Sequence, residues 1–448
     1  MAVGTAAPLP VGPAAPPTGL TARAAARLRT RLTSTETPAR LRLLLLATVA
    51  ASLLWGAAAA WTAGQQASAA GNVVGVSEPL SYDAEQIYRS LSDADATEAT
   101  AFLAGIEPPA ARSQYLADIA RAETYLETAT AAGNQGSRSE LTVLSTGIPI
   151  YTGLVETARA DNLQGLPVGA AYLGEASSLM RRRLLPAADL LYQQENAQLS
   201  AADGQATGLP VLAIIVALAA AFVLLRAQRW VSRRTHRSFN RGLLTASVAL
   251  LLSLGWLLTA VIVARVQLLD ARDRGSAPVE ALAQADIATL RAHADESLTL
   301  INREGDDANQ ADFLQVERQL GPGPGTLFTA AASAAGGSPG ARPAAAAAAA
   351  APAWFTAHRK VRALDDSGNY DAAVQLSIGS GPASSGTLFR RVETGLTTAI
   401  GLDESAFSTA AGRGGDALTG LEAGMIAAAV VMATGCAWGL ARRLAEYR

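Results

Sequence analysis

Four uninterrupted apolar segments alternate with long segments of mixed polarity along the chain. The apolar segments are 43–63, 209–225, 243–264 and 423–441, and none of them contains a charged residue. A helix needs about 20 predominantly apolar residues to cross the hydrocarbon core of a bilayer. These segments have 21, 17, 22 and 19 residues, so the pattern predicts four transmembrane helices.

The charges beside these segments predict their orientation. Segments 1–42, 226–241 and 442–448 have net charges of +5, +6 and +2, whereas 64–208 and 266–422 have −9 and −7. Short loops rich in Arg and Lys stay on the cytoplasmic side of a membrane. We therefore expect a multi-pass plasma-membrane protein with a largely disordered cytoplasmic tail (1–42), a basic cytoplasmic hairpin (226–241) and a cytoplasmic C-terminal tail (442–448).

One alternative concerns the first apolar segment. Ala67-Ser68-Ala69 resembles a signal-peptidase site that follows an apolar stretch. The segment before it is about 40 residues long, which is far longer than an ordinary signal-peptide n-region. A retained membrane span is the preferred interpretation, and cleavage is the alternative.

The two long segments, 64–208 and 265–422, have the residue pattern of helical bundles outside the membrane. Ile87, Leu91 and Phe102 recur at helical spacing on one face, and Gly105 then supplies a stop signal. Helices joined by short turns pack as antiparallel neighbours. In the first long segment we expect helices at 84–103, 109–132, 138–162 and from 167 to the second span.

The chain reads as one unit written twice, with the order span, long segment, span. Repeats of this kind show as ordered matches at a slowly drifting offset. The fold class expected is therefore all-α: four transmembrane helices and two extracytoplasmic four-helix-bundle-like domains in tandem duplication. The matches include Ile87 with Ile287, Asp95 with Asp295 and Gly105 with Gly305 at 200 residues, Gly165 with Gly368 at 203, and Arg181-Arg182 with Arg390-Arg391 at 209.

Residues 321–353 interrupt the second copy. They begin with Gly321-Pro322-Gly323-Pro324-Gly325 and include the run of alanines Ala344–Ala351. No Lys-Ser or Lys-Thr follows the glycines, so the stretch does not match a phosphate-binding loop. Low-complexity composition of this kind favours a flexible, disordered insertion.

The composition offers no catalytic constellation. Half of the residues are hydrophobic, 17% are charged and the net charge is −2, which predicts a membrane protein with no nucleic-acid partner. The one cysteine and three histidines fall in separate segments, so neither a metal site nor a cofactor is expected. Acid pairs such as Asp93/Asp95 and Asp295/Glu296 are read as solvated surface. The chain is predicted not to be an enzyme.

The spans themselves carry no charged residue at mid-membrane depth, which disfavours a transport pathway for ions. Gly435 and Gly439 form a Gly-x-x-x-Gly spacing that lets helices approach closely. This spacing packs either the spans of one chain or, in a homodimer, those of two chains. The basic hairpin 226–241 is placed to contact anionic membrane lipid.

The turns farthest from the membrane are the candidate partner-binding surface. They are mostly acidic, and charged rims steer association and set specificity. The alternative is that these acids only keep the domain soluble. The candidate residues are Asp161, Asn162, Glu304, Asp306, Asp307, Asp365 and Asp366.

The stretches IYRSLSDADATEATAFLAG (87–105) and RAHADESLTLINRE (291–304), with residues 160–192, resemble the GlnX-like family of actinobacterial membrane proteins. The turn at 368–373 is also similar to those of chemoreceptor sensor bundles. The resemblance covers the chain except 1–20 and 321–353. It implies a sensor-transducer that reads a glutamine-type solute-binding lipoprotein outside and informs a cytosolic Ser/Thr protein kinase of the G type. No binding residue follows from it.

The distribution of residues agrees with a transducer, because the cytoplasmic segments are too short to fold as an output domain. A signal would then pass inward by movement of helices that a partner reads. The alternatives are a structural or envelope-assembly scaffold and an accessory subunit of a transporter.

Overall fold

The computed structural model describes residues 37–132, 136–206, 208, 210–235, 240–302, 307–321 and 323–445. Throughout these ranges the regular elements are helices, as the sequence predicts. The chain divides into two compact units, and each is described by itself. The apolar unit comprises Met1–Thr62, Pro210–Leu258 and Gly420–Arg448, and the bundle unit comprises Ala63–Leu209 and Thr259–Thr419.

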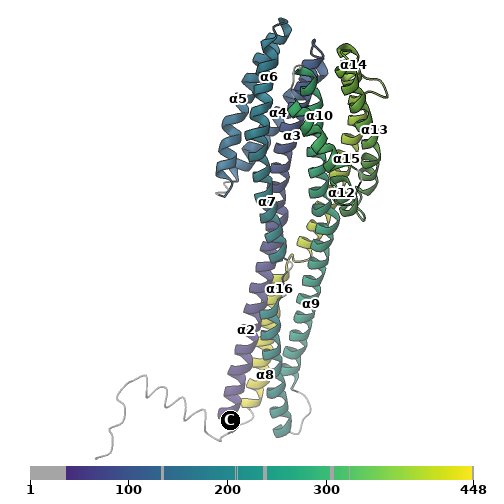
Figure 1. Ribbon diagram of the computed structural model, residues 1–448. Helices are drawn as coiled ribbons and strands as arrows, with labels where there is room; N and C mark the ends of the chain where they lie inside the picture. Colours follow the sequence, from purple (N-terminus) through teal and green to yellow (C-terminus); the bar gives the residue numbers. More distant parts are fainter. Residues whose placement is uncertain are drawn as a thin grey trace, which may run out of the picture. The chain divides into compact units, whose positions relative to one another are not determined.

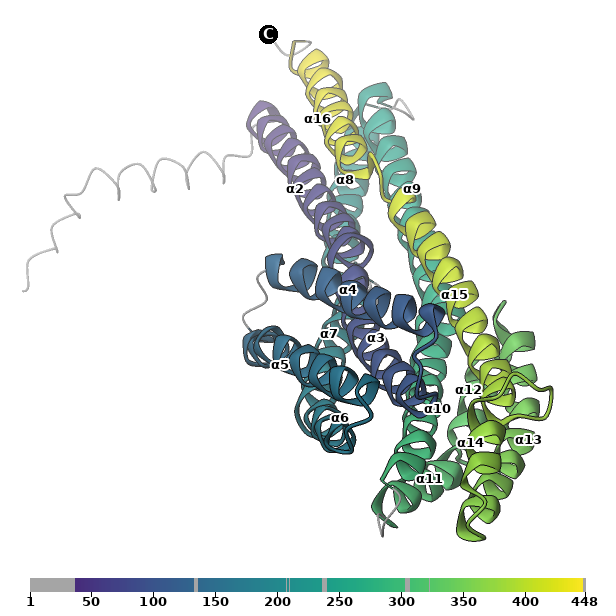
Figure 2. The same ribbon diagram turned by 90° about the horizontal axis from the view of Figure 1, so that it is seen from above.

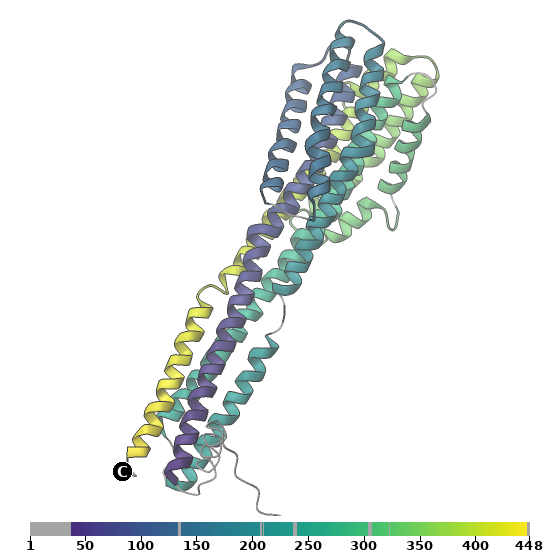
Figure 3. The ribbon, with the colours of Figure 1, turned by 90° about the vertical axis from the view of Figure 1, so that its left-hand side faces the viewer.

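Four helices form the described part of the apolar unit and run side by side (Figure 1 and Figure 3). Each is long and apolar enough to cross a membrane, and each contains nearly all of one predicted span. The number and placement of the spans therefore agree with the prediction for a membrane protein. The helices are α2 (Thr37–Asn72), α8 (Val211–Thr235), α9 (Arg241–Ala271) and α16 (Leu421–Ala445).

The apolar unit carries apolar side chains outward and places several polar ones inside. Leu54, Phe222 and Leu251 are 65%, 65% and 67% exposed. In the interior, the indole Nε1 of Trp55 donates a hydrogen bond to Ser253 Oγ at 3.0 Å. A surface this apolar is stable in lipid and unfavourable in water, so the packing supports the four-span interpretation.

The predicted Gly435–Gly439 motif lies where α16 meets α9. A methyl group added at Gly242 of α9 would lie 2.6 Å from the Cα of Gly439, closer than packed carbon atoms approach. The Asn240 side-chain amide also donates to the Gly439 carbonyl at 2.9 Å. The close approach of these glycines is therefore made within one chain.

The first half of the bundle unit has the helices and turns expected from its glycines and prolines. A π-helical turn, η1 (Val73–Ser77), leads into them without a break in the helix. The hydrophobic core of this first half is formed by apolar side chains from several helices, including Ile87, Tyr115, Ile148 and Leu184. The helices are α3 (Glu78–Leu103), α4 (Pro109–Ala131), α5 (Arg138–Leu163), α6 (Val168–Leu179) and α7 (Leu185–Ala206), with the π-helical turn η2 (Met180–Leu184) joining the last two.

The second half of the bundle unit also consists of helices joined by turns, in a larger number of pieces. It begins with a π-helical turn, η3 (Arg272–Ser276), which lies 199 residues after η1. Its core is built around Phe313, Trp354 and Phe389. The helices are α10 (Ala277–Ile301), α11 (Asp307–Leu320), α12 (Leu327–Ala334), α13 (Ala341–Asp366), α14 (Tyr370–Ile378) and α15 (Ser385–Asp416).

The prediction of a flexible insertion at 321–353 is wrong for most of that range. Residues 327–334 form α12, and the alanine run Ala344–Ala351 forms the first turns of α13. Ala347 is fully buried against Gly395 of α15. Alanine is the strongest helix former, and its small side chain lets two helices pack closely. The alanine-rich segment therefore forms a packed helix.

Helices α3 and α10 lie side by side at the centre of the bundle unit. Figure 2 shows α4, α5 and α6 on one side of this pair and α13, α14 and α15 on the other. Both central helices are consequently covered on most faces. The polar seam, defined as the facing surfaces of α3 and α10 with the side chains that reach them, holds most of the buried charge described below.

Candidate functional site

The predicted docking residues lie at helix ends in the bundle unit. Asp161 and Asn162 are in the last turn of α5, and Asp365 and Asp366 are in the last turn of α13. Glu304 and Asp306 fall outside the described residues. Asp307 begins α11, and its side chain is likewise outside the description.

Both described turns close in the same way. After α5, the amides of Gly165 and Leu166 donate to the carbonyls of Asn162 and Asp161, each at 2.9 Å. After α13, Gly368 and Asn369 donate to Asp365 and Leu364, also at 2.9 Å. The glycines have φ of 70° and 79°, a left-handed conformation that strains other residues. Helix termination therefore accounts for both glycines.

The side chains of Asn162, Asp365 and Asp366 already have partners within the bundle unit. Arg362 donates to Asp365 at 2.6 Å and to Asp366 at 2.9 Å. The Asn162 side-chain amide donates to the Phe102 carbonyl at 3.2 Å, which holds α5 to the end of α3. The α13 turn is therefore less acidic than its sequence suggests, and docking at these turns stays a prediction.

The polar seam brings together charged groups from both halves. Arg89 Nε of α3 lies 3.1 Å from Asp286 Oδ2 of α10. Arg181 of η2 forms an ion pair with Asp295 of α10 and donates to Asn309 Oδ1 at 3.1 Å. Each ion pair joins an arginine of the first half to an aspartate of the second. The seam therefore couples the two halves electrostatically.

The acid pairs expected on solvated surface are largely buried, which corrects the prediction. Asp95, Asp295 and Glu296 are 3%, 0% and 1% exposed. Ser177 Oγ donates to Asp95 Oδ1 at 2.8 Å, and the Tyr151 hydroxyl donates to it at 3.4 Å. The reason is the central position of α3 and α10, whose polar faces meet other helices instead of water.

The second half contains a further buried polar network around Glu296. The Glu296 carboxylate lies 2.8 Å from His358 Nδ1 and accepts hydrogen bonds from Ser385 Oγ at 2.7 Å and from Ser377 Oγ at 3.0 Å. Burial alone would raise the pKa of Glu296, but the hydrogen bond and electrostatic attraction of His358, with the hydrogen bond from Ser385, hold it below its ordinary value. The network joins α10 to α13, α14 and α15.

Burial makes most carboxyl groups along the seam weak acids. It raises the pKa of Asp286 to about 6 against the opposing charge of Arg89. It raises that of Asp295 to about 7 against Arg181, and that of Glu393 to about 7. Burial also lowers the pKa of His293 to about 4, so this imidazole is neutral at physiological pH. Several seam charges therefore titrate close to neutrality.

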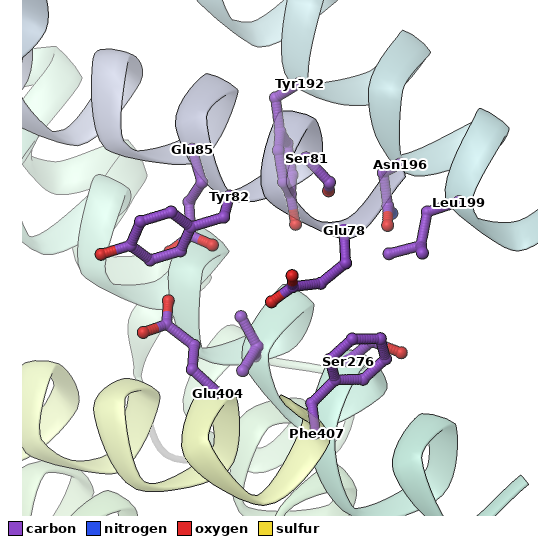
Figure 4. Close-up of a pocket in the computed structure, with 11 residues that line it drawn as sticks. Glu78, Ser81, Tyr82, Glu85, Tyr192, Asn196, Leu199, Ser276, Glu404 and Phe407 are labelled. Carbon is purple, nitrogen blue, oxygen red and sulfur yellow. The ribbon is translucent and has the colours of Figure 1, made fainter. Parts of the chain in front are cut away.

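A carboxylate pocket lies beside the seam, between α3, α7, η3, α10 and α15. Figure 4 shows the carboxyl groups of Glu78, Glu85 and Glu404 directed toward its centre. Burial raises the pKa of Glu85 to about 8 and that of Glu404 to about 7. The remaining lining residues are Ser81, Tyr82, Tyr192, Asn196, Leu199, Ser276, Val279 and Phe407.

Sequence reasoning named several seam residues without recognising the seam. The sequence pattern marks Asp95 and Asp295 as repeat positions and as solvated surface acids, and Arg181 as a repeat position. Glu85, Arg89 and the pocket were not singled out. The available signal was the placement of acids on all faces of the segment 83–98, which an exposed amphipathic helix does not need.

Comparison with known proteins adds one match. Residues 69–204 match the family model described as "Actinobacterial sensor domain". The match runs from the end of α2 through α7, the first half of the bundle unit, and indicates a sensing role. No curated protein and no solved structure is significantly similar to the chain.

Proposed function

We propose that this chain is a non-enzymatic transmembrane sensor-transducer. The match of residues 69–204 to a sensor domain carries the proposal, and four helices able to cross a membrane support it. In this proposal the bundle unit lies outside the cell, the termini and the basic hairpin lie in the cytoplasm, and the bundle unit reads an amino acid or its binding protein.

The two halves of the bundle unit are proposed to be tandem copies of one sensor domain. Support comes from the shared helix order, from the turns η1 and η3 at an offset of 199 residues, and from the glycine turns at Gly165 and Gly368. The family match itself covers the first copy. A duplicated sensor gives two central helices, and their seam is a surface whose packing a signal can change.

A route for the signal is present in the backbone. The helix that includes the first candidate span runs without interruption from 40 to 103, and that of the third runs from 241 to 301. Helices α3 and α10, which carry the seam, are the ends of these runs. A shift or rotation of a packed helix is a common form of switching, so rearrangement of the seam has a direct covalent path into two spans.

The partners proposed are a solute-binding lipoprotein outside and a Ser/Thr protein kinase in the cytosol. The resemblance of residues 87–105 and 291–304 to the GlnX-like family supports both. The described docking candidates are Asp161, Asn162, Asp365 and Asp366.

A crosslink between two spans tests transduction. Ser52 Oγ of α2 lies 3.9 Å from Cys436 Sγ of α16, and Cys436 is the chain's only cysteine. In Ser52→Cys, oxidation in intact cells of the native host should join α2 to α16. We expect the rate of crosslinking to change when glutamine or another amino acid is supplied outside. The same rate under every amino-acid condition would contradict a transducer.

Two controls make the result specific. Ser52→Cys combined with Cys436→Ser should form no intramolecular crosslink. The combination of Ser52→Cys with Arg181→Met removes a seam ion pair and should change the response while the basal crosslink still forms. A full response without Arg181 would exclude the seam as the route.

A further inference from the structure

We propose that the carboxylate pocket binds a small organic cation that carries a protonated amine. The pocket is lined by Glu78 and Glu85 of α3 and by Glu404 of α15, so both halves of the bundle unit contribute acids. The inference goes beyond the sensing role and does not depend on it, because binding is measured directly.

The pocket has carboxylate oxygens without partners. The residue Glu85 is 3% exposed, and its Oε1 is buried without a hydrogen-bond partner. The Oε1 of Glu404 is also buried and unpartnered. A buried ionised carboxylate is costly unless a cation or hydrogen-bond donor faces it. The arrangement therefore lacks positive charge at the place where these oxygens point.

The charged groups around the two glutamates do not supply that charge. Arg89 attracts both Glu85 and Glu404, but its Nε lies 3.1 Å from Asp286. Asp286 also repels Glu85, and Glu78 repels Glu404. One guanidinium thus serves several acids, and a bound cation would relieve their mutual repulsion.

The rest of the lining suits an organic cation. Tyr82, Tyr192 and Phe407 provide aromatic rings, which attract ammonium groups, and Asn196 provides an amide. Among the described residues no cluster of three or more His, Cys, Asp or Glu side chains is placed to hold a metal ion. These features favour a small amine over a metal ion.

The pocket is also built from unusual backbone. Glu78 follows η1 directly, and Ser276 is the last residue of η3. A side chain at Gly275 of η3 would meet the backbone of Phe407, so a residue without a side chain lets α15 approach. π-helical turns occur frequently at functional sites. Here η3 contributes Ser276 to the pocket lining, and η1 ends one residue before Glu78.

The test measures binding of butane-1,4-diamine to the purified full chain in detergent by calorimetry and thermal stabilisation. We expect saturable binding that butane-1,4-diol, its neutral analogue, does not reproduce. Glu85→Gln and Glu404→Gln should each weaken binding about tenfold or more, since a hydrogen bond to a charged group contributes about 1.5–3 kcal/mol. Glu123→Gln, an equal charge change at an exposed position of α4, should leave binding unchanged.

Three outcomes would overturn the proposal. They are equal binding of diamine and diol, equal diamine affinity in Glu85→Gln and Glu123→Gln, and stabilisation by calcium or magnesium chloride that exceeds that by the diamine. Glu85→Gln should fold at least as well as the parent chain, because it replaces a buried carboxyl group, whose ionised form is unfavourable there, with a neutral amide of similar shape. If Glu85→Gln does not fold, Glu404→Gln, at a less buried position, decides the matter alone.

Discussion

Arg89 Nε on α3 lies 3.1 Å from Asp286 Oδ2 on α10, and the Asp286 side chain is 1% exposed. The two residues belong to different halves of the bundle unit and are 197 positions apart in sequence. A buried ion pair contributes little net stability compared with apolar packing, but breaking it leaves an uncompensated charge. The pair therefore constrains how α3 and α10 face each other.

A double-mutant cycle tests this constraint. Arg89→Met should lower the unfolding free energy by about 3–5 kcal/mol, because it leaves Asp286 buried without its partner. Asp286→Asn should cost less, since Arg89 is partly exposed. The double variant should recover part of the loss. The measurement is denaturant unfolding of the full chain in detergent, and additive effects would show that the two side chains do not interact.

The helices of the first half were predictable because local signals agree with one another. Gly105, Pro109 and Gly165 stop or start helices through backbone conformation alone, without regard to distant contacts. The burial of Asp95 and Asp295 was not predictable, because it depends on which helices cover α3 and α10. The same limit applies to Ala344–Ala351, whose packing against α15 is a tertiary feature.

The glycine turns give a second prediction. Gly165→Ala and Gly368→Ala should each destabilise the chain by about 1–2 kcal/mol, because an L side chain is strained at φ of 70° or 79°. Gly174 lies inside α6 with nothing within 4 Å of an added methyl group. Gly174→Ala should therefore stabilise by about 0.5–1 kcal/mol. Equal effects at Gly165 and Gly174 would contradict the left-handed turn.

The spans provide a third prediction. Gly242→Ala should destabilise the apolar unit, because the added methyl group would lie 2.6 Å from the Gly439 Cα. Gly255→Ala, on the same helix α9 with nothing within 4 Å, is the matched control and should be neutral or stabilising. The stability of each variant is measured as its resistance to unfolding by sodium dodecyl sulfate. If the two variants behave alike, the close approach of α9 and α16 is not formed in the membrane.

Orientation is the fourth prediction and depends on the basic segments. A reporter that is active only in the cytoplasm should work when fused after Arg237. A reporter active only outside should work after Gly136. Activity of the cytoplasmic reporter at Gly136 would place the bundle unit inside the cell and remove the proposed sensing of an exterior solute.

The last prediction concerns pH and follows from the carboxylate pocket. Burial raises the pKa of Glu85 to about 8 and that of Glu404 to about 7, far above the ordinary value of about 4.3 in an unfolded chain. The folded chain therefore holds protons that the unfolded chain has released. The resulting stability is complete below about pH 4, is lost progressively as the pH rises, and is gone once the pH has passed about 7–8.

We expect the midpoint of thermal unfolding in detergent to fall between about pH 6.5 and about pH 8 and to level off above that. His293 does not oppose this trend, because its lowered pKa affects stability only below about pH 6.5. Glu85→Gln should flatten the dependence, whereas Glu123→Gln should preserve it. Saturating butane-1,4-diamine should also flatten it, because a bound cation stabilises the ionised carboxylates. A midpoint that stays constant over this range would show that Glu85 and Glu404 are already ionised in the folded chain without any ligand.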